Sequence, residues 1–154
     1  MMKSEKDFGG YWLKNIKTFK SQEGEIFQAS VYKDNKKIGF FSEDGHGGPA
    51  TLEGIKQYES SEIITLKECA KAVDRTPSDE SYHVFIAKIA DTILFNRKIK
   101  RLCKTRIVFT YKSDPKDNYR TINRVFTPGM GTRFRETMKK QHNKIVGVIY
   151  NELV

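Results

Sequence analysis

The chemistry that this sequence offers lies mainly in its cations, and these are unevenly distributed. Residues 97–154 contain 15 lysines and arginines against 4 carboxylates, a net charge of +11, whereas residues 1–96 contain 13 against 15, a net charge of −2. Such a concentration of one sign raises the local concentration of oppositely charged molecules and speeds their capture. The C-terminal third is therefore predicted to bind an anionic partner: nucleic acid, a nucleotide, an acidic protein face or an anionic membrane surface.

The densest group of cations falls within ten residues, 97–106, and is expected to form the centre of the binding surface. Aromatic rings lie among the cations that follow, and rings beside arginine suit base stacking and cation–π contacts. The competing interpretation is a helix face that is only solvated, since lysine and arginine are ordinary surface residues. The predicted ligand-binding residues are Arg97, Lys98, Lys100, Arg101, Lys104, Arg106, Tyr111, Tyr119, Arg120, Arg124 and Arg133.

A glycine-rich segment, residues 42–49 (SEDGHGGP), is the second candidate site. Consecutive glycines let backbone N–H groups converge on a phosphate. The segment lacks the Gly-Lys-Ser/Thr ending of a phosphate-binding P-loop, and Asp44 would repel an anion. A structural turn is therefore the favoured interpretation.

Metal and catalytic signatures are weak. The histidines, His46, His83 and His142, show no spacing typical of metal ligands. The carboxylates of Glu43, Asp44 and Glu53 could hold Mg²⁺ in a nuclease, but they are no denser than chance allows. No catalytic residue, metal or cofactor is therefore predicted.

The elements that must position these residues are typical of an α+β protein. The pattern of the N-terminal segment predicts a three-stranded antiparallel meander. The residues from Thr51 onward have a pattern typical of a helix, and two central helices follow. The turn between the second and third strands falls at Asp34-Asn35, which tolerate left-handed backbone angles. The predicted strands are 14–19, 25–32 and 37–42, and the predicted helices are 62–73 and 81 to about 104.

The C-terminal segment predicts a β-hairpin, a final helix and a last short strand. The hairpin strands are 106–112 and 119–126, and in the expected register Lys112, Arg120 and Arg124 share a face with Arg106. The final helix is capped by Thr132 and runs to about residue 144, followed by the strand 146–150. Its inward side chains are predicted to be Phe134, Met138 and Ile145.

Length and composition indicate one soluble domain, residues 1–154, in which an acidic to neutral segment (residues 1–96) precedes a strongly basic segment (residues 97–154). Cys69 and Cys103 are expected to be unpaired in a reducing cytoplasm. The first residues contain no apolar core typical of a signal peptide. No stretch approaches the ~20 apolar residues of a membrane span, so no membrane is expected as a partner.

Several short segments carry a resemblance to known proteins. They are 14–19 (KNIKTF), 31–39 (VYKDNKKIG), 44–48 (DGHGG), 104–109 (KTRIVF) and 119–121 (YRT). In these segments the chain resembles a group of small proteins encoded by bacteriophages and bacterial mobile elements, for which no biochemical function is assigned. The resemblance implies the cytoplasm of a bacterial host cell and carries over no catalytic residues.

The leading hypothesis is a non-catalytic, phage-type accessory protein that binds nucleic acid or a charged nucleotide through its basic C-terminal surface. A small nucleotide would need an enclosed pocket, which a second subunit of a homo-oligomer would complete. One alternative is an inhibitor that binds an acidic surface of a host defence protein, and another is a metal-dependent nuclease or nucleotide hydrolase. Rings that face the cations favour nucleic acid, whereas rings turned into the core favour a protein partner or no partner at all.

Overall fold

The computed structural model describes residues 2–56 and 60–154. The chain divides into two compact units, which we call the N-terminal unit (residues 3–93) and the C-terminal unit (Met2 with residues 94–154). Residues 94–96 are uncharged, so the C-terminal unit carries the whole +11 of residues 97–154 and the N-terminal unit carries −2. The predicted α+β class is confirmed, while the single domain remains a prediction.

The N-terminal unit is built on a four-stranded antiparallel sheet in the order β1-β2-β3-β4. The three predicted strands are confirmed, and each is as long as or longer than expected. The strands are β1 (Tyr11–Ser21), β2 (Gly24–Lys33), β3 (Lys36–Ser42) and β4 (Thr51–Gly54). The turn after β2 contains Asp34 and Asn35 at φ 48° and 66°, as their tolerance of left-handed angles predicted.

The fourth strand corrects the helical start that was expected at Thr51. Leu52 lies opposite Phe41 and is buried with it, so this segment alternates as a strand does. Gly54 lies opposite Gly39, where an added side chain at Gly39 would meet the backbone oxygen of Glu53. Gly39 thus allows a close approach of β3 and β4 that a side chain there would prevent.

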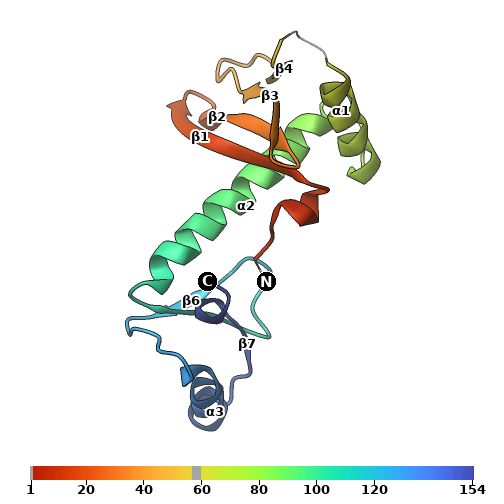
Figure 1. Ribbon diagram of the computed structural model, residues 1–154. Helices are drawn as coiled ribbons and strands as arrows, with labels where there is room; N and C mark the ends of the chain where they lie inside the picture. The colour runs from red at the N-terminus through yellow and green to blue at the C-terminus, as the bar shows by residue number, and fades with distance from the viewer. Residues whose placement is uncertain (1, 57–59) are drawn as a thin grey trace. The chain divides into compact units, whose positions relative to one another are not determined.

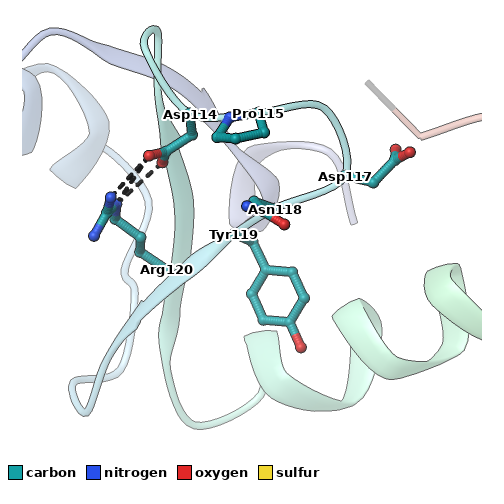
Figure 2. Close-up of a pocket in the computed structure, with 6 residues that line it drawn as sticks. All are labelled: Asp114, Pro115, Asp117, Asn118, Tyr119 and Arg120. Carbon is teal, nitrogen blue, oxygen red and sulfur yellow. Dashed lines mark hydrogen bonds and ion pairs between the residues drawn. The ribbon is translucent and has the colours of Figure 1, made fainter.

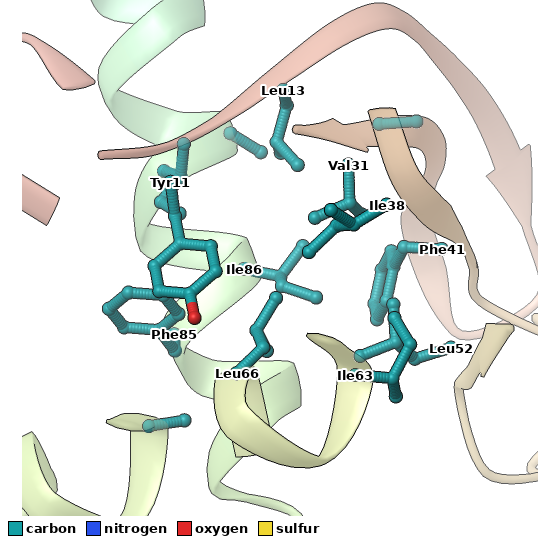
Figure 3. Packing of buried hydrophobic residues seen from close by; sticks show 14 of the residues in the cluster. Tyr11, Leu13, Val31, Ile38, Phe41, Leu52, Ile63, Leu66, Phe85 and Ile86 are labelled. Atoms are coloured by element: carbon teal, nitrogen blue, oxygen red, sulfur yellow. The ribbon is translucent and has the colours of Figure 1, made fainter. Parts of the chain in front are cut away.

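Helices cover one face of this sheet (Figure 1). The helix α1 (Ser61–Val73) begins at the N-cap Ser60, whose hydroxyl accepts the N–H of Ile63. The helix α2 (Ser81–Cys103) supplies its first half to this unit. Both predicted helices are confirmed to within one residue. Figure 3 shows the buried side chains between sheet and helices, among them Tyr11, Leu13, Val31, Phe41, Ile63, Leu66, Phe85 and Ile86.

The C-terminal unit is a three-stranded antiparallel sheet between two helices (Figure 1). Its strand order is β6-β5-β7, from β6 (Arg120–Ile122), β5 (Ile107–Tyr111) and β7 (Val146–Ile149). Ile107 and Phe109 of β5 pack with α3 (Met130–His142), while Val108 packs with Ile99 near the end of α2. The central strand is therefore buried on both faces, and the chain ends in the short 3₁₀ helix η2 (Tyr150–Glu152).

Three boundaries in this unit differ from the sequence predictions. The second hairpin strand stops at Ile122 because the N–H of Arg124 turns back to the Ile122 carbonyl. Helix α3 starts at Met130, after Gly129 at φ 87°, so Thr132 lies inside the helix and does not cap it. Met138 is buried as predicted, but Ile145 is 57% exposed because it lies in the link before β7.

Candidate functional site

The last turns of α2 form a cationic stripe on the side of the helix that faces away from the C-terminal core. At about 100° per residue, Arg97, Lys100 and Arg101 fall within an arc of about 100°, and Lys104 follows in the turn directly after the helix. Ile99 and Leu102 lie on the opposite side and pack in the core with Val108 and Tyr150. We call these four exposed residues the basic stripe: Arg97, Lys100, Arg101 and Lys104.

Asn151 fixes the point where the basic stripe ends and β5 begins. Its amide Nδ2 donates to the carbonyls of Cys103 (3.3 Å) and Arg106 (2.8 Å), and its Oδ1 accepts the N–H of Val108 (2.8 Å). These bonds satisfy carbonyls at a helix end that would otherwise need water. The exposed turn that carries Lys104 and Arg106 is thereby tied to the end of the chain.

The pairing of β5 with β6 adds cations at the same place. Ile107 lies directly opposite Ile122, so Arg106 before β5 and Arg124 after β6 lie at the same end of the hairpin. Both side chains are exposed. We call Arg106 and Arg124 the hairpin cations, and they extend the charge beyond the end of α2.

The other predicted arginines lie elsewhere. Arg120 lies directly opposite Phe109, whose ring packs against α3, so Arg120 lies on the α3 side of the sheet. Arg133 belongs to α3 itself. The register therefore overturns the expected common face of Arg120 with Arg106, and it divides the predicted site residues between the two sides of the sheet.

Few carboxylates neutralise this unit. In residues 94–154, all of which the structure describes, the ion pairs within the unit are Arg120 with Asp114 (2.8 Å) and Arg135 with Glu152 (2.6 Å). Both pairs are bidentate, which holds the two guanidinium groups in fixed positions. The basic stripe and the hairpin cations have no such partner in the unit, and their charge is open to solvent.

The two predicted tyrosines contact cations but are half-buried. The ring of Tyr119 lies edge-on to Phe95 and under the ammonium group of Lys98, whose Nζ is 5.4 Å from the ring centroid. On the other side of the sheet, the guanidinium of Arg120 lies 4.7 Å from the ring centroid of Tyr111. Figure 2 shows Tyr119 and Arg120 pointing to different sides. Both rings therefore face cations, and in each case the cation is a side chain of the same unit that lies against the ring.

The pocket in this unit has the wrong charge for an anion. It has a volume of about 360 Å³ and its lining includes two carboxylates, those of Asp114 and Asp117 (Figure 2). Hydrogen bonds from Arg120, followed by the N–H of Tyr111, hold the pKa of the Asp114 carboxyl below its usual range. The carboxylate therefore stays ionised at neutral pH, and the one arginine in the lining is committed to it. No residue pattern in the sequence predicted this pocket.

The glycine-rich segment is held by its own side chains. The Asp44 carboxylate accepts the N–H of Gly48 (3.0 Å), while Gly45 and Gly47 have φ of 74° and 82°. Within the same segment, Glu43 contacts His83 (2.9 Å) and accepts the N–H of Phe27 (3.2 Å). The N–H of Gly48, which could have bound a phosphate, is thus already bonded to the negatively charged Asp44 carboxylate.

Two features of residues 2–56 and 60–154 concern metal ligands and membrane-spanning helices. In these ranges no three histidines, cysteines or carboxylates lie close enough together to hold a metal ion. None of the helices formed there has the length and apolar character needed to cross a membrane. Cys69 and Cys103 are unpaired.

Comparisons with known protein families, with curated proteins and with solved structures returned no match to this chain.

Proposed function

We propose that the C-terminal unit binds polymeric nucleic acid through its phosphates. The observation that carries the proposal is the basic stripe: three exposed cations on one side of α2 and a fourth in the turn after it, continued by the hairpin cations, with no carboxylate of the unit paired to them. Each phosphate that such cations contact releases condensed counterions, which supplies most of the affinity of nonspecific nucleic-acid binding. We further propose that the protein acts in the bacterial cytoplasm, the setting that its resemblance to phage proteins implies.

A polymer fits this surface better than a single nucleotide does. Small ligands bind in enclosed, largely apolar pockets with a few polar groups. The basic stripe lies on the outer side of a helix, and the pocket between Asp114 and Arg120 is lined by carboxylates. A nucleic-acid strand presents phosphates along its length, so an exposed row of cations can contact several at once.

Phosphate contacts suit this unit better than base stacking. A stacking platform needs several rings on one surface, whereas Tyr111 and Tyr119 lie on opposite sides of the sheet, against Arg120 and Lys98. Binding through phosphates carries little sequence information. We therefore propose that this unit binds with low sequence preference and strong dependence on salt.

Charge reversal with a matched control tests the proposal. The test variant is Arg97→Glu with Arg101→Glu, and the control is Lys6→Glu with Lys88→Glu, which changes the net charge equally but in the N-terminal unit. Fluorescence anisotropy of a short labelled DNA duplex should show affinity lower by about tenfold or more for the test variant and much less change for the control.

Circular dichroism of both variants checks that the fold is intact. Equal losses for the two variants would show that only overall charge matters, and no loss for the test variant would show that the basic stripe does not bind. Either result would overturn the proposal. Stoichiometric capture of an acidic protein, with no binding to DNA, would favour the inhibitor hypothesis instead.

A further inference from the structure

The sheet of the N-terminal unit has a second face, opposite the one that packs on the helices. Alternation along β1 puts Tyr11 and Leu13 in the core and therefore turns Trp12 and Lys14 to the other side. The register then assigns their neighbours, because Trp12 lies opposite Tyr32 and Lys14 lies opposite Ser30. We call this side of the sheet the outer face.

Two bulges determine which residues reach the outer face. From Lys14 to Lys17 the strand β1 advances three residues, while its partner β2 advances two, from Ser30 to Gln28. The extra residue sits at Asn15, whose φ of 54° is tolerated by asparagine. Ile16 is thereby turned to the core, and Lys17 joins Lys14 on the outer face.

The second bulge acts in the same way on β3. Tyr32 lies opposite Lys37 and Val31 lies opposite Gly39, so Ile38 is the extra residue and is buried in the core. Beyond it, Phe40 lies opposite Ser30 and returns to the outer face. These three rings and three lysines thus share one side of three adjacent strands, and Phe19, opposite Ile26, lies further along the same side. We call them the platform: Trp12, Lys14, Lys17, Tyr32, Lys37 and Phe40.

The rings of the platform remain partly open. Phe40 is 39% exposed, and Tyr32 is half-buried with the ammonium group of Lys14 4.4 Å from its ring centroid. Trp12 is half-buried because, on the edge strand, it packs against the core and against Phe8 in the 3₁₀ helix η1 (Glu5–Phe8). A single exposed ring on a sheet is common and needs no explanation. Three rings beside three lysines form a contiguous patch, and such patches mark interaction sites.

The charge of the platform is opposite to that of its unit. In the four strands, which the structure describes completely, the carboxylates are Glu25 and Glu53, and the register puts only Glu53 on the outer face, opposite Phe40. The platform is therefore cationic although the N-terminal unit carries −2.

We infer that the platform is a second nucleic-acid site, which binds single strands by stacking bases on Trp12, Tyr32 and Phe40. Lysines between the rings are placed to contact the phosphates that join stacked bases. A duplex cannot use such a platform, because its bases are stacked on each other and paired. The inference does not depend on the basic stripe, which belongs to the other unit.

A second copy of the chain fits the outer face less well. A symmetric pair would bring the same patch of both subunits together and would face lysines against lysines. An anionic strand with flat bases complements both components of the patch, the rings and the ammonium groups. Charge and ring chemistry therefore point to the same occupant.

The single tryptophan of the chain makes the inference directly testable. In the full-length protein, titration with oligothymidylate should quench Trp12 fluorescence to saturation, because stacked bases quench indole emission. The double variant Tyr32→Ala with Phe40→Ala keeps Trp12 and should weaken binding by about tenfold or more. A DNA duplex should leave Trp12 emission nearly unchanged.

Two variants separate this site from the basic stripe. Arg97→Glu with Arg101→Glu should retain the quenching. Lys14→Glu with Lys17→Glu should lower the affinity for oligothymidylate, measured by the quenching, about tenfold or more. Because this lysine variant keeps the three rings, it also tests the site if the ring variant fails to fold. Binding of oligothymidylate without quenching would overturn the inference. So would equal quenching by the duplex, or light scattering that shows the quenched species to be a dimer.

Discussion

The two units both bring aromatic rings and cations together, but they do so in opposite ways. In the C-terminal unit the cations of the basic stripe project into solvent, while Tyr111 and Tyr119 are half-buried on opposite sides of the sheet. In the N-terminal unit the rings lie together on the outer face of a sheet, with lysines between them. From this difference we propose that a row of cations marks a surface for phosphates, whereas rings gathered on one face mark a surface for bases.

The geometry of the elements explains this difference. A helix repeats every 3.6 residues, so cations three and four apart gather into one stripe while the core residues gather opposite. A strand alternates, so one side of a sheet can carry rings and lysines at neighbouring positions on adjacent strands. A mildly acidic unit can therefore hold a cationic platform, provided that its carboxylates lie elsewhere.

Deleting Ile16 should have the largest effect on this comparison. Asn15 and Ile16 lie between the pairs Lys14–Ser30 and Lys17–Gln28, where β2 has the single residue Ala29, and Ile16 packs against the core. The deletion leaves Lys17 on the outer face and puts Asn15 at the position that faces the core. We expect a loss of up to about 3 kcal/mol in the free energy of unfolding, from the lost burial of Ile16. Deletion of Asn15 is the matched control, because it keeps Ile16 on the core side and should cost less. Urea denaturation followed by Trp12 fluorescence measures both. Equal midpoints for the two deletions would mean that the bulge does not turn Ile16 to the core.

Asn151→Ala should produce the next largest effect, in the C-terminal unit. It leaves the carbonyls of Cys103 and Arg106 and the N–H of Val108 without their side-chain partner. The expected cost is about 1–3 kcal/mol in the free energy of unfolding. Thermal unfolding by circular dichroism measures the cost. Asn151→Asp separates the bonds: it keeps the acceptor for Val108 but turns a carboxylate oxygen toward the two carbonyls, so it should cost at least as much as the loss of the two donated bonds. Wild-type stability of Asn151→Ala would contradict the anchoring role.

Truncating one ring in each unit compares their roles directly. Tyr119→Ala removes a half-buried ring from contacts with Phe95 and Lys98, and should cost about 1–2 kcal/mol in the free energy of unfolding. Tyr32→Ala removes a ring from the outer face and should cost less than about 1 kcal/mol, mostly its contact with Lys14. Chemical denaturation of both variants measures the difference. A larger cost at Tyr32 would reverse our assignment of packed and open rings.

The smallest expected effect concerns the pH dependence of the C-terminal unit. Hydrogen bonds from Arg120 lower the pKa of the folded Asp114 carboxyl. The stability that this lowering contributes is present above the ordinary aspartate pKa, about 3.9, and is lost as the pH falls through the lowered folded value. Arg120→Met should therefore raise the pKa of Asp114, as followed by an NMR pH titration. An unchanged pKa would show that the pair does not hold this carboxylate.

The sequence alone predicted the elements that have a strong period and missed those set by tertiary contacts. The three long strands and the two central helices follow from alternation and from helical spacing of apolar residues. The strand β4 is only four residues long and ends in glycine, so its pairing with β3 decides its structure. The early end of β6 likewise depends on a local turn at Arg124.

The candidate sites divide in the same way. The basic stripe was predictable because its residues are close in sequence on one helix. The separation of Arg120 from Arg106 depends on the register of the hairpin, which the sequence does not specify. The role of Asn151 was also hidden, because its partners lie 43 to 48 residues away. The platform depends on two bulges, and without them alternation assigns Lys17 to the wrong side.

The salt dependence of duplex binding tests the central claim most directly. For a series that neutralises Arg97, Lys100, Arg101 and Lys104 one after another to glutamine, the slope of log affinity against log salt concentration is measured for each protein. If these side chains contact phosphates, the slope should become shallower by about 0.9 with each substitution. A slope that stays constant through the whole series would mean that the basic stripe does not bind nucleic acid.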